Sequence, residues 1–272
     1  MAAGHSGLSL MPEVGYERSG AAAVITIDRP ERRNAVDPNT ADQLLEAYRG
    51  FEADDEARVM ILTGAGEEAF CAGADLKSVA AAMNDEGIAQ QWLKPRPDGP
   101  LGFTRITPSK PTIAAISGWA LAGGLELALW CDLRVGTETA RLGFPERRWG
   151  VPLIDGGTQR LPRIVGMGRA LDMILTGRIV EAEEALGLGL LTEVVPPRKH
   201  LERSLEMAEG LASFPQETML ADRRSALEGF GLPLEEGLAR EAEIGGAVTG
   251  VGVEGAARFA AGEGRGGKGA GV

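Results

Sequence analysis

Two stretches of the chain follow the same plan: residues 61–76 read ILTGAGEEAFCAGADL, and residues 114–127 read AAISGWALAGGLEL. Each stretch runs from a predicted strand, through a glycine and a short loop, into a turn of small residues that opens a helix. Small residues in such a turn permit unusual backbone dihedral angles and allow a ligand to approach closely. The first amides of a helix have no acceptor within it and lie at the positive end of its dipole. The sequence therefore predicts two turns that offer backbone N–H groups to a ligand.

If the two turns face each other, they can hold one oxygen atom between them. The amides of Ala72 and Gly123 are then the predicted donors of an oxyanion hole, which suits a thioester carbonyl that becomes an enolate. Close packing of a helix on a strand explains a single turn of this kind equally well. The pair of turns, rather than either one alone, favours the oxyanion hole.

Two glutamates accompany the turns. Glu126 lies three residues after Gly123, about one helical turn along, so it projects beside the same amides. Glu146 follows the turn-like segment Gly143-Phe144-Pro145. If both carboxyl groups reach one pocket, their repulsion and their loss of hydration raise the pKa of at least one of them. The two glutamates are therefore candidates for a general acid and a general base.

Predicted strands and helices alternate along most of the chain, which favours an α/β domain. A strong helix start is Asp37-Pro38, where an N-cap residue precedes a proline in the first helical position. The predicted strands are Ala21–Asp28, Arg58–Gly64, Pro111–Gly118, Leu133–Thr137 and Leu190–Val195.

Composition narrows the class of protein. With 44% hydrophobic and 25% charged residues in 272, the chain matches an average soluble globular protein. No segment approaches the roughly 18 uninterrupted apolar residues of a membrane helix, and Met1–Tyr16 lacks the pattern of a signal or transit peptide. The net charge of −11 opposes binding to nucleic acid. We therefore expect a cytoplasmic protein that neither inserts in a membrane nor binds nucleic acid.

Cysteine and histidine offer little chemistry. Cys71 and Cys131 lie in no CxxC or Cys/His pattern, so we expect reduced thiols and neither a disulfide framework nor a metal site. The two histidines are His5, close to the N-terminus, and His200, late in the chain. Catalysis is therefore expected to rest on carboxylates and backbone groups.

Several motifs, taken in order, resemble the enoyl-CoA hydratase/isomerase (crotonase) family. They are Asn34-Ala35 after Arg29-Pro30, AFCAGADLK (residues 69–77), KPTIAAISGWALAGGLELALWCD (110–132), RLGFPE (141–146), GGTQRLPRIVG (156–166) and LTGR (175–178). The resemblance covers roughly residues 15–197. It implies an α/β spiral of repeated ββα units, followed by a C-terminal helical region that assembles a homotrimer or a dimer of trimers.

The resemblance also implies roles for individual residues. The oxyanion donors fall on Ala72 and Gly123, and Glu126 and Glu146 hold the water that adds to a trans-2-enoyl-CoA. Residues expected to contact the acyl-CoA thioester are Ala35, Ala72, Gly73, Ala74, Asp75, Leu76 and Lys77. Coenzyme A is part of this substrate, so no separate cofactor and no metal is expected.

The chain divides into four predicted segments. Residues 1–14 form a flexible N-terminus, and residues 15–197 form the crotonase-like spiral core. Residues 198–261 form a helical region with predicted helices at His200–Phe214, Gln216–Phe230 and Leu234–Thr249, and residues 262–272 form a disordered glycine-rich tail. A Pro/Gly-rich loop at Lys94–Pro100 either covers a pocket or is a plain surface excursion.

Some positions depart from the family pattern. Ile154 stands where typical hydratases have a glycine beside the catalytic water, and Arg147 and Arg148 stand where they have aliphatic residues. A branched side chain at position 154 is expected to narrow the pocket or to turn the backbone. Asp155 is either an N-cap for the following helix or a possible additional acid.

Three functions therefore stay open at this stage. The first is hydration of a 2-enoyl-CoA to a 3-hydroxyacyl-CoA. The second is another enolate reaction on an acyl-CoA, such as isomerisation of a double bond. The third is acyl-CoA binding without turnover, because a fold does not fix a function.

Overall fold

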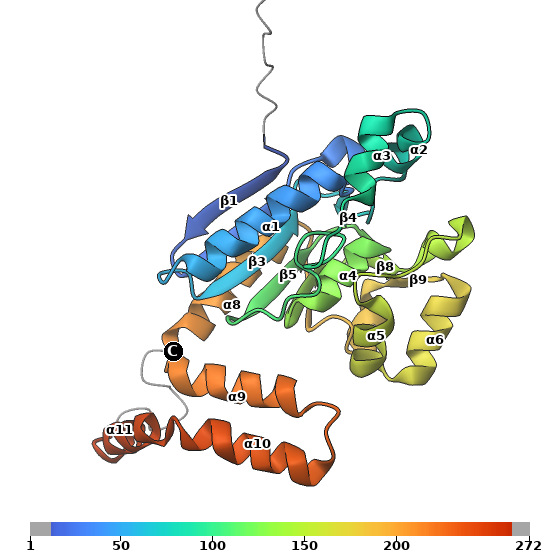
Figure 1. Cartoon of the computed structure of the whole chain (residues 1–272). Coiled ribbons are helices and arrows are strands. Elements are labelled where there is room, and N and C mark those ends of the chain that lie inside the picture. The colour runs from blue at the N-terminus through green and yellow to red at the C-terminus, as the bar shows by residue number, and fades with distance from the viewer. Residues whose placement is uncertain (1–11, 263–272) are drawn as a thin grey trace, which may run out of the picture.

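Two β-sheets form the centre of the molecule, and the computed structural model describes residues 12–262 of the chain (Figure 1). The first sheet has six strands in the order β1-β2-β3-β5-β7-β10, and the second has four in the order β4-β6-β8-β9. The strands are β1 (Val14–Ser19), β2 (Ala22–Ile27), β3 (Val59–Gly64), β4 (Ala69–Cys71), β5 (Thr112–Ile116), β6 (Trp119–Leu121), β7 (Leu133–Thr137), β8 (Arg141–Gly143), β9 (Ile179–Glu181) and β10 (Glu193–Val195).

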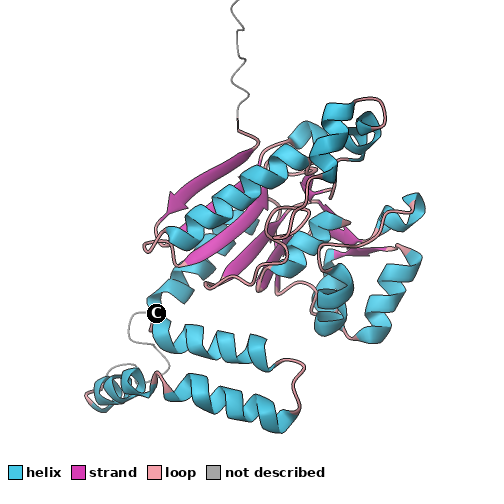
Figure 2. Ribbon diagram, viewed as in Figure 1, coloured by secondary structure: helices cyan, strands magenta, loops and turns pink. Residues whose placement is uncertain are grey.

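Helices surround the sheets and extend to one side of them (Figure 2). They are α1 (Pro38–Ala53), α2 (Leu76–Ala82), α3 (Glu86–Leu93), α4 (Gly123–Trp130), α5 (Gly157–Val165), α6 (Met167–Thr176), α7 (Ala182–Gly187), α8 (His200–Ser213), α9 (Gln216–Gly229), α10 (Leu234–Gly246) and α11 (Thr249–Ala260), with 3-10 helices at Pro30–Arg32 and Pro145–Trp149. The Asp37 carboxylate caps α1 by accepting a hydrogen bond from the Thr40 N–H at 2.9 Å, as the Asp37-Pro38 pair predicts.

The strands show a repeated plan. In each of three consecutive units, the first strand joins the large sheet, the second joins the small sheet, and a helix follows: β3-β4-α2, β5-β6-α4 and β7-β8-α5. Pairing is parallel except between β1 and β2 and between β8 and β9. The chain therefore winds as a spiral of ββα turns, which confirms the predicted α/β architecture.

Both faces of the large sheet are buried. One face packs against α1, α4 and the small sheet, and the other packs against α8, so β3 is buried along its whole length. Strands buried on both faces read as continuous apolar runs, which explains the VMIL segment of β3. The α8 side chains in this layer are Leu201, Leu205, Met207, Ala208 and Leu211.

The last helices stand apart from the sheets (Figure 1). α9 and α10 lie side by side, and α11 contacts α9. Arg223 ties α9 to the core through Asp132, with two N–O distances of 3.0 Å. The predicted helix Leu234–Thr249 corresponds to α10, which ends three residues earlier at the Gly245-Gly246 pair because glycine is a poor helix former. A further helix, α11, begins at Thr249.

The predicted segment boundaries stay a prediction. Residues 1–11 and 263–272, which contain most of the predicted flexible termini, lie outside the described residues. β1 begins at Val14. Within residues 12–262, no helix combines the length and the apolar character that crossing a membrane requires.

Gly118 lies where two segments of the backbone come into close contact, and a substitution there tests this contact. Its φ is +60°, and a Cβ atom there would lie 2.0 Å from the backbone oxygen of Glu68. Gly118→Ala should lower the free energy of unfolding by on the order of 3 kcal/mol, because backbone strain adds to a clash with fixed atoms. Denaturant unfolding measures this change.

Gly168→Ala is the matched control. Gly168 lies in α6, and a Cβ atom added to it would meet no other atom within 4 Å, so alanine there should keep or slightly raise stability. Equal unfolding midpoints for the two variants would contradict the close approach at Gly118.

Candidate active site

The turn between β6 and α4 holds an unusual backbone conformation. Ala122 has φ 51° and ψ −125°, a combination that residues with a side chain rarely adopt and that costs about 1–3 kcal/mol. The Ala122 N–H donates to the Gly143 carbonyl at 2.9 Å, which fixes the turn from one side. A Cβ on Gly124 would lie 2.0 Å from the Cys71 carbonyl oxygen, so the start of α4 presses on the strand before the other small-residue turn.

The two small-residue turns touch each other. Gly73 has φ +90°, and a Cβ atom on it would lie 2.9 Å from the Gly123 nitrogen and 3.0 Å from the Ala122 Cβ. Only glycine fits this position without displacing the neighbouring turn. Gly123 begins α4, and its N–H is one of the amides that have no acceptor within the helix. The structure thus brings together the two turns that the sequence pairs by their pattern.

One predicted donor is wrong. The N–H of Ala72 donates to the Arg33 carbonyl at 3.0 Å, so it is already used within the fold. Nothing in the sequence reveals this bond, because it depends on where the Arg33 turn lies in three dimensions.

The N–H of Ala74, two residues further along the same turn, is not used in this way. Val36 and Ala74 form a parallel bridge whose two hydrogen bonds use the Gly73 carbonyl and the Asp75 N–H, at 2.8 and 2.9 Å. In such a bridge the N–H of Ala74 points away from Val36. Among residues 12–262 it has no acceptor, and Ala74 lines the same cavity as Gly123. The amides of Ala74 and Gly123 are therefore the pair that the structure leaves available.

The cavity beside these turns has a volume of about 130 Å³. Trp92, Pro100 and Leu101 line it, so the segment around the predicted Lys94–Pro100 loop contributes to its wall. Ile154 also lines it while remaining half exposed. The predicted site residues that line the cavity are Ala72, Ala74, Leu76, Gly123, Glu126, Glu146 and Asp155, whereas Ala35, Gly73, Asp75 and Lys77 do not.

Both glutamates reach this cavity from different elements. Glu126 lies on α4, and its Oε1 accepts hydrogen bonds from the N–H groups of Asp155 at 3.0 Å and Gly157 at 2.7 Å. Glu146 lies on the 3-10 helix Pro145–Trp149, and both of its carboxyl oxygens are buried without a hydrogen-bond partner among residues 12–262. A buried carboxyl group without donors is costly, so it marks a position where water or a ligand supplies the missing partner.

Burial changes the protonation of both groups. It raises the pKa of Glu126 to about 7, where the negative charges of Asp155 and Glu146 add to the effect and the Gly157 N–H opposes it. Burial also raises the pKa of Glu146. A carboxyl group with a pKa near neutral pH can act as an acid or a base at that pH. The fold therefore brings two carboxyl groups with raised pKa values to one cavity.

Arg29 holds the loop of residues 72–77, which is expected to contact coenzyme A, through an ion pair with Asp75. The buried Arg29 guanidinium lies 3.3 Å from the Asp75 carboxylate and 3.0 Å from that of Asp37. The Asp75 carboxylate also accepts hydrogen bonds from the N–H groups of Lys77 and Ser78 and so caps α2. The Asp75 side chain is buried and fully engaged, which assigns it to shaping the loop.

The exposed part of this loop is available to a ligand. Leu76 and Lys77 are exposed, and Lys77 makes no ion pair among residues 12–262. The backbone carbonyl of Ala35 accepts a hydrogen bond from Arg29 at 2.5 Å. No pattern in the sequence indicates this role of Arg29, since an arginine after a strand usually lies at the surface.

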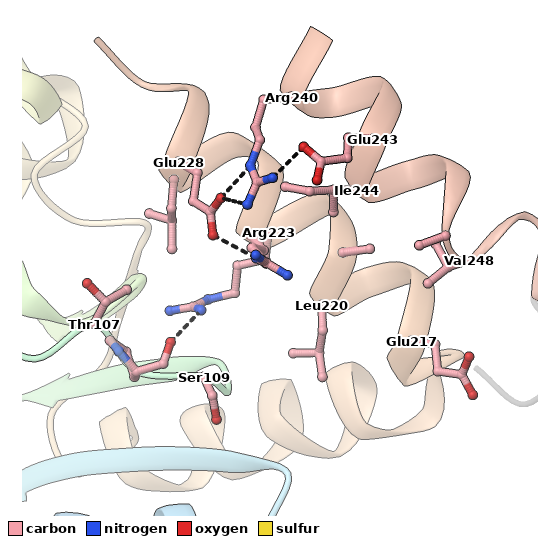
Figure 3. A pocket seen from close by; sticks show the side chains of 15 residues that line it. Thr107, Ser109, Glu217, Leu220, Arg223, Glu228, Arg240, Glu243, Ile244 and Val248 are labelled. Carbon is pink, nitrogen blue, oxygen red and sulfur yellow. Dashed lines mark hydrogen bonds and ion pairs between the residues drawn. The ribbon is translucent and has the colours of Figure 1, made fainter. Parts of the chain in front are cut away.

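A second, larger pocket shares no lining residue with this cavity. It has a volume of about 640 Å³ and opens between α9, α10 and the segment Thr107–Ser109 (Figure 3). Its arginines are paired, for example Arg240 with Glu228 and Glu243. None of the predicted site residues lines it. It is therefore a space beside the C-terminal helices.

Other reactive groups are few. Cys71 and Cys131 are buried and free of disulfides, and burial raises the pKa of each thiol to about 12, which makes both unreactive. In the part of the chain that the structure describes, no group of three or more His, Cys, Asp or Glu side chains is arranged to hold a metal ion.

Comparison with known proteins agrees with this geometry. Residues 17–254 match the family model described as enoyl-CoA hydratase/isomerase. The chain belongs to this family. Its crotonase-type α/β spiral with a C-terminal helical region is shared with an enoyl-CoA hydratase from Mycobacterium marinum, at a TM-score of 0.82 and 35% identity over 92% of this chain and 96% of that one.

Curated relatives carry several hydratase names. The chain is 38% identical to (E)-benzylidenesuccinyl-CoA hydratase of Thauera aromatica over 83% of this chain and 86% of that protein. It is 37% identical to short-chain-enoyl-CoA hydratase of Clostridium acetobutylicum over 84% of this chain and 85% of that protein. These family members therefore differ from one another in the acyl group that their names specify.

The raised pKa of Glu126 makes a prediction about stability. The folded state favours neutral Glu126, so this contribution is fully present below about pH 4.5 and is lost as the pH rises through about 7. Glu126→Gln removes the titration. From pH 5 to pH 8, wild-type protein should lose about 1–3 kcal/mol of unfolding free energy relative to the variant. Urea unfolding across this range checks it, and parallel pH curves would contradict the shift.

Proposed function

We propose that this chain adds water reversibly across the double bond of a trans-2-enoyl-CoA to give a 3-hydroxyacyl-CoA. The observation that carries the proposal is one cavity that combines two backbone amides without an acceptor among residues 12–262, from Ala74 and Gly123, with two buried carboxyl groups, from Glu126 and Glu146. This combination suits a reaction in which a carbonyl oxygen becomes negative while a proton and a hydroxyl group are delivered nearby.

The two amides bind the thioester oxygen. As water adds to the β-carbon, electron density moves through the double bond to this oxygen, and an enolate forms. Fixed N–H donors stabilise that charge without having to reorganise, and removal of one such donor typically costs about 10²- to 10³-fold in rate. The strain at Ala122 is consistent with this role, because it directs the start of α4 toward the ligand.

The two glutamates handle the water. An ionised carboxylate takes one proton from the water as its oxygen bonds to the β-carbon. A neutral carboxyl group gives a proton to the α-carbon when the enolate collapses, so one O–H and one π bond are replaced by one C–O and one C–H bond. Raised pKa values of both groups favour this pairing of one charged and one neutral form near neutral pH.

The rest of the substrate lies along the Ala72–Lys77 loop in this proposal. Leu76 and Lys77 are exposed at its end, which supports a contact of the apolar side chain with the pantetheine arm and of the ammonium group with a phosphate. Coenzyme A arrives as part of the substrate, and the proposal needs no separate cofactor. The cytoplasmic location also stays a prediction.

We also propose that further copies of this chain are its partners, in a homotrimer or a dimer of trimers. α10 and α11 contact the rest of the described chain mainly through α9. Large apolar side chains on α9, α10, α11 and the turn between α9 and α10 are exposed: Leu227, Phe230, Leu232, Leu234, Leu238, Val253 and Phe259. Burial of such a surface between identical chains stabilises an oligomer.

The other two functions have less support. An isomerase needs a carboxyl group that carries a proton between two carbon atoms, and the extra acid, Asp155, is held in place through Oδ1 by hydrogen bonds from Leu101 and Thr104. A binding protein without turnover would gain nothing from two buried glutamates, one of which lacks any donor among the described residues. Different acyl groups in the names of relatives leave the acyl group of this substrate open.

The hydratase proposal is tested with crotonyl-CoA. Absorbance of the conjugated enoyl thioester should fall when enzyme is added in water. Glu126→Gln and Glu146→Gln should each lower turnover by about 10²- to 10⁴-fold with little change in CoA affinity. The glutamine amide has nearly the shape of the carboxyl group that it replaces, but it cannot transfer the proton. No fall in absorbance with enoyl-CoA of any chain length would overturn the proposal, and wild-type turnover in either variant would remove that glutamate from the mechanism.

The contact between the two turns is tested by a pair of glycine variants. Gly73→Ala places a Cβ atom 2.9 Å from the Gly123 nitrogen, so it should displace the oxyanion donors and lower turnover by on the order of 10²-fold. Gly66→Ala carries the same type of backbone strain at φ +80° but meets only the Pro30 side chain, at 4.0 Å. If both variants lose turnover only in proportion to lost stability, the contact has no special role.

A further inference from the structure

Asp155 has a position that neither of its sequence-based interpretations describes. It precedes α5, but the N-cap of α5 is Gly156, and no side chain caps that helix. The predicted N-cap role is therefore wrong. The carboxyl group is instead buried against the cavity wall, at 4% exposure of the residue.

The Asp155 carboxylate holds a loop that forms another part of the cavity wall. Its Oδ1 accepts a hydrogen bond from the Leu101 N–H at 3.0 Å and another from the Thr104 hydroxyl group. Two glycines in the loop, Gly99 and Gly102, have φ values of +127° and +106°. Such a segment has many alternative conformations when unbound, so the contacts from Asp155 select one of them.

The conformation of this loop matters for the oxyanion turn. A Cβ atom on Gly123 would lie 2.5 Å from the Leu101 Cδ1, so the Leu101 side chain rests directly on the first residue of α4. Leu101 and Pro100 also line the cavity. A shift of Leu101 therefore changes both the shape of the cavity and the packing on the Gly123 donor.

Asp155 contacts the catalytic carboxyl group as well. Its backbone N–H donates to Glu126 Oε1 at 3.0 Å. The Arg160 guanidinium adds a second tie between the same segments, because it donates to the Asp155 carbonyl at 2.9 Å and to the Thr104 carbonyl at 2.6 Å. Asp155 thus contacts the loop with its side chain and Glu126 with its backbone N–H.

We propose that Asp155 is a positioning residue, whose carboxylate fixes the Leu101–Thr104 segment against the oxyanion turn while its N–H orients Glu126. This role rests on the proposed hydratase function for its effect on turnover. It assigns no proton transfer to Asp155, because the role uses Oδ1, which accepts both hydrogen bonds, and the backbone N–H.

Charge gives the same residue a second effect on Glu126. The titratable and charged groups that interact with Asp155 are the Glu126 carboxyl group, the Cys71 thiol and the guanidinium groups of Arg105 and Arg160. Burial raises the pKa of Asp155, and the two arginines oppose this. Its negative charge raises the pKa of Glu126, so removal of that charge should move the ionisation of Glu126 to lower pH.

Two substitutions at one position test the proposal. Asp155→Ala removes both side-chain bonds and should lower kcat by about 10- to 100-fold, because a displacement of about 1 Å at a reacting centre costs up to this much. Asp155→Asn keeps an oxygen that accepts both bonds, so it should recover most of the lost turnover while the pH–rate profile moves to lower pH. Asp55→Asn, at an exposed carboxylate, is the matched charge control and should change neither.

Hydrogen exchange measures the order of the loop independently of enzyme turnover. The Leu101 amide should exchange faster in Asp155→Ala than in wild-type protein, and Asp155→Asn should restore its protection. Thr104→Val removes one of the two bonds at nearly constant volume and should give an intermediate exchange rate, which keeps the test available if Asp155→Ala does not fold.

Each outcome of these measurements supports or overturns the positioning role. Asp155→Asn as inactive as Asp155→Ala, with its loop protection intact, would overturn the proposal and assign Asp155 a proton-transfer step. Wild-type exchange and turnover in both Asp155→Ala and Thr104→Val would also overturn it. Altered exchange in a protein whose wild-type form hydrates no enoyl-CoA would confirm the loop contact and refute the hydratase function instead.

Discussion

The contact between Gly73 and the Ala122-Gly123 turn is the constraint on which the site depends. The two turns come from successive ββα units, and they meet because β4 and β6 are neighbours in the small sheet. Any residue with a side chain at position 73 would separate them. The spiral thus does more than enclose a core: it brings equivalent turns of consecutive repeats within contact distance.

Several features near this contact oppose folding. Ala122 has a strained backbone, Glu146 is buried without a donor among the described residues, and Glu126 is held where its charged form is disfavoured. Each costs a few kcal/mol at most, and the core on both faces of the large sheet offsets them. Such costs are typical of sites where a reacting group must be ready for a charge that appears only during the reaction.

Local features of the site could be predicted from the sequence, and long-range ones could not. The N-cap at Asp37, the apolar run of β3 and the position of Glu126 on α4 follow from spacing within a few residues. The choice of Ala74 over Ala72 depends on a hydrogen bond to Arg33. The role of Asp155 depends on residues more than 50 positions away, since the separation along the chain is 54 residues for Leu101 and 51 for Thr104.

In the proposed mechanism, the thioester oxygen lies between the amides of Ala74 and Gly123. A crystal structure with acetoacetyl-CoA bound tests this placement most directly. We predict that the thioester oxygen lies about 2.7–3.2 Å from both amide nitrogens, with the Ala72 N–H still bonded to the Arg33 carbonyl. A thioester oxygen outside hydrogen-bond distance of Gly123, or one bound by Ala72 in place of Ala74, would contradict it.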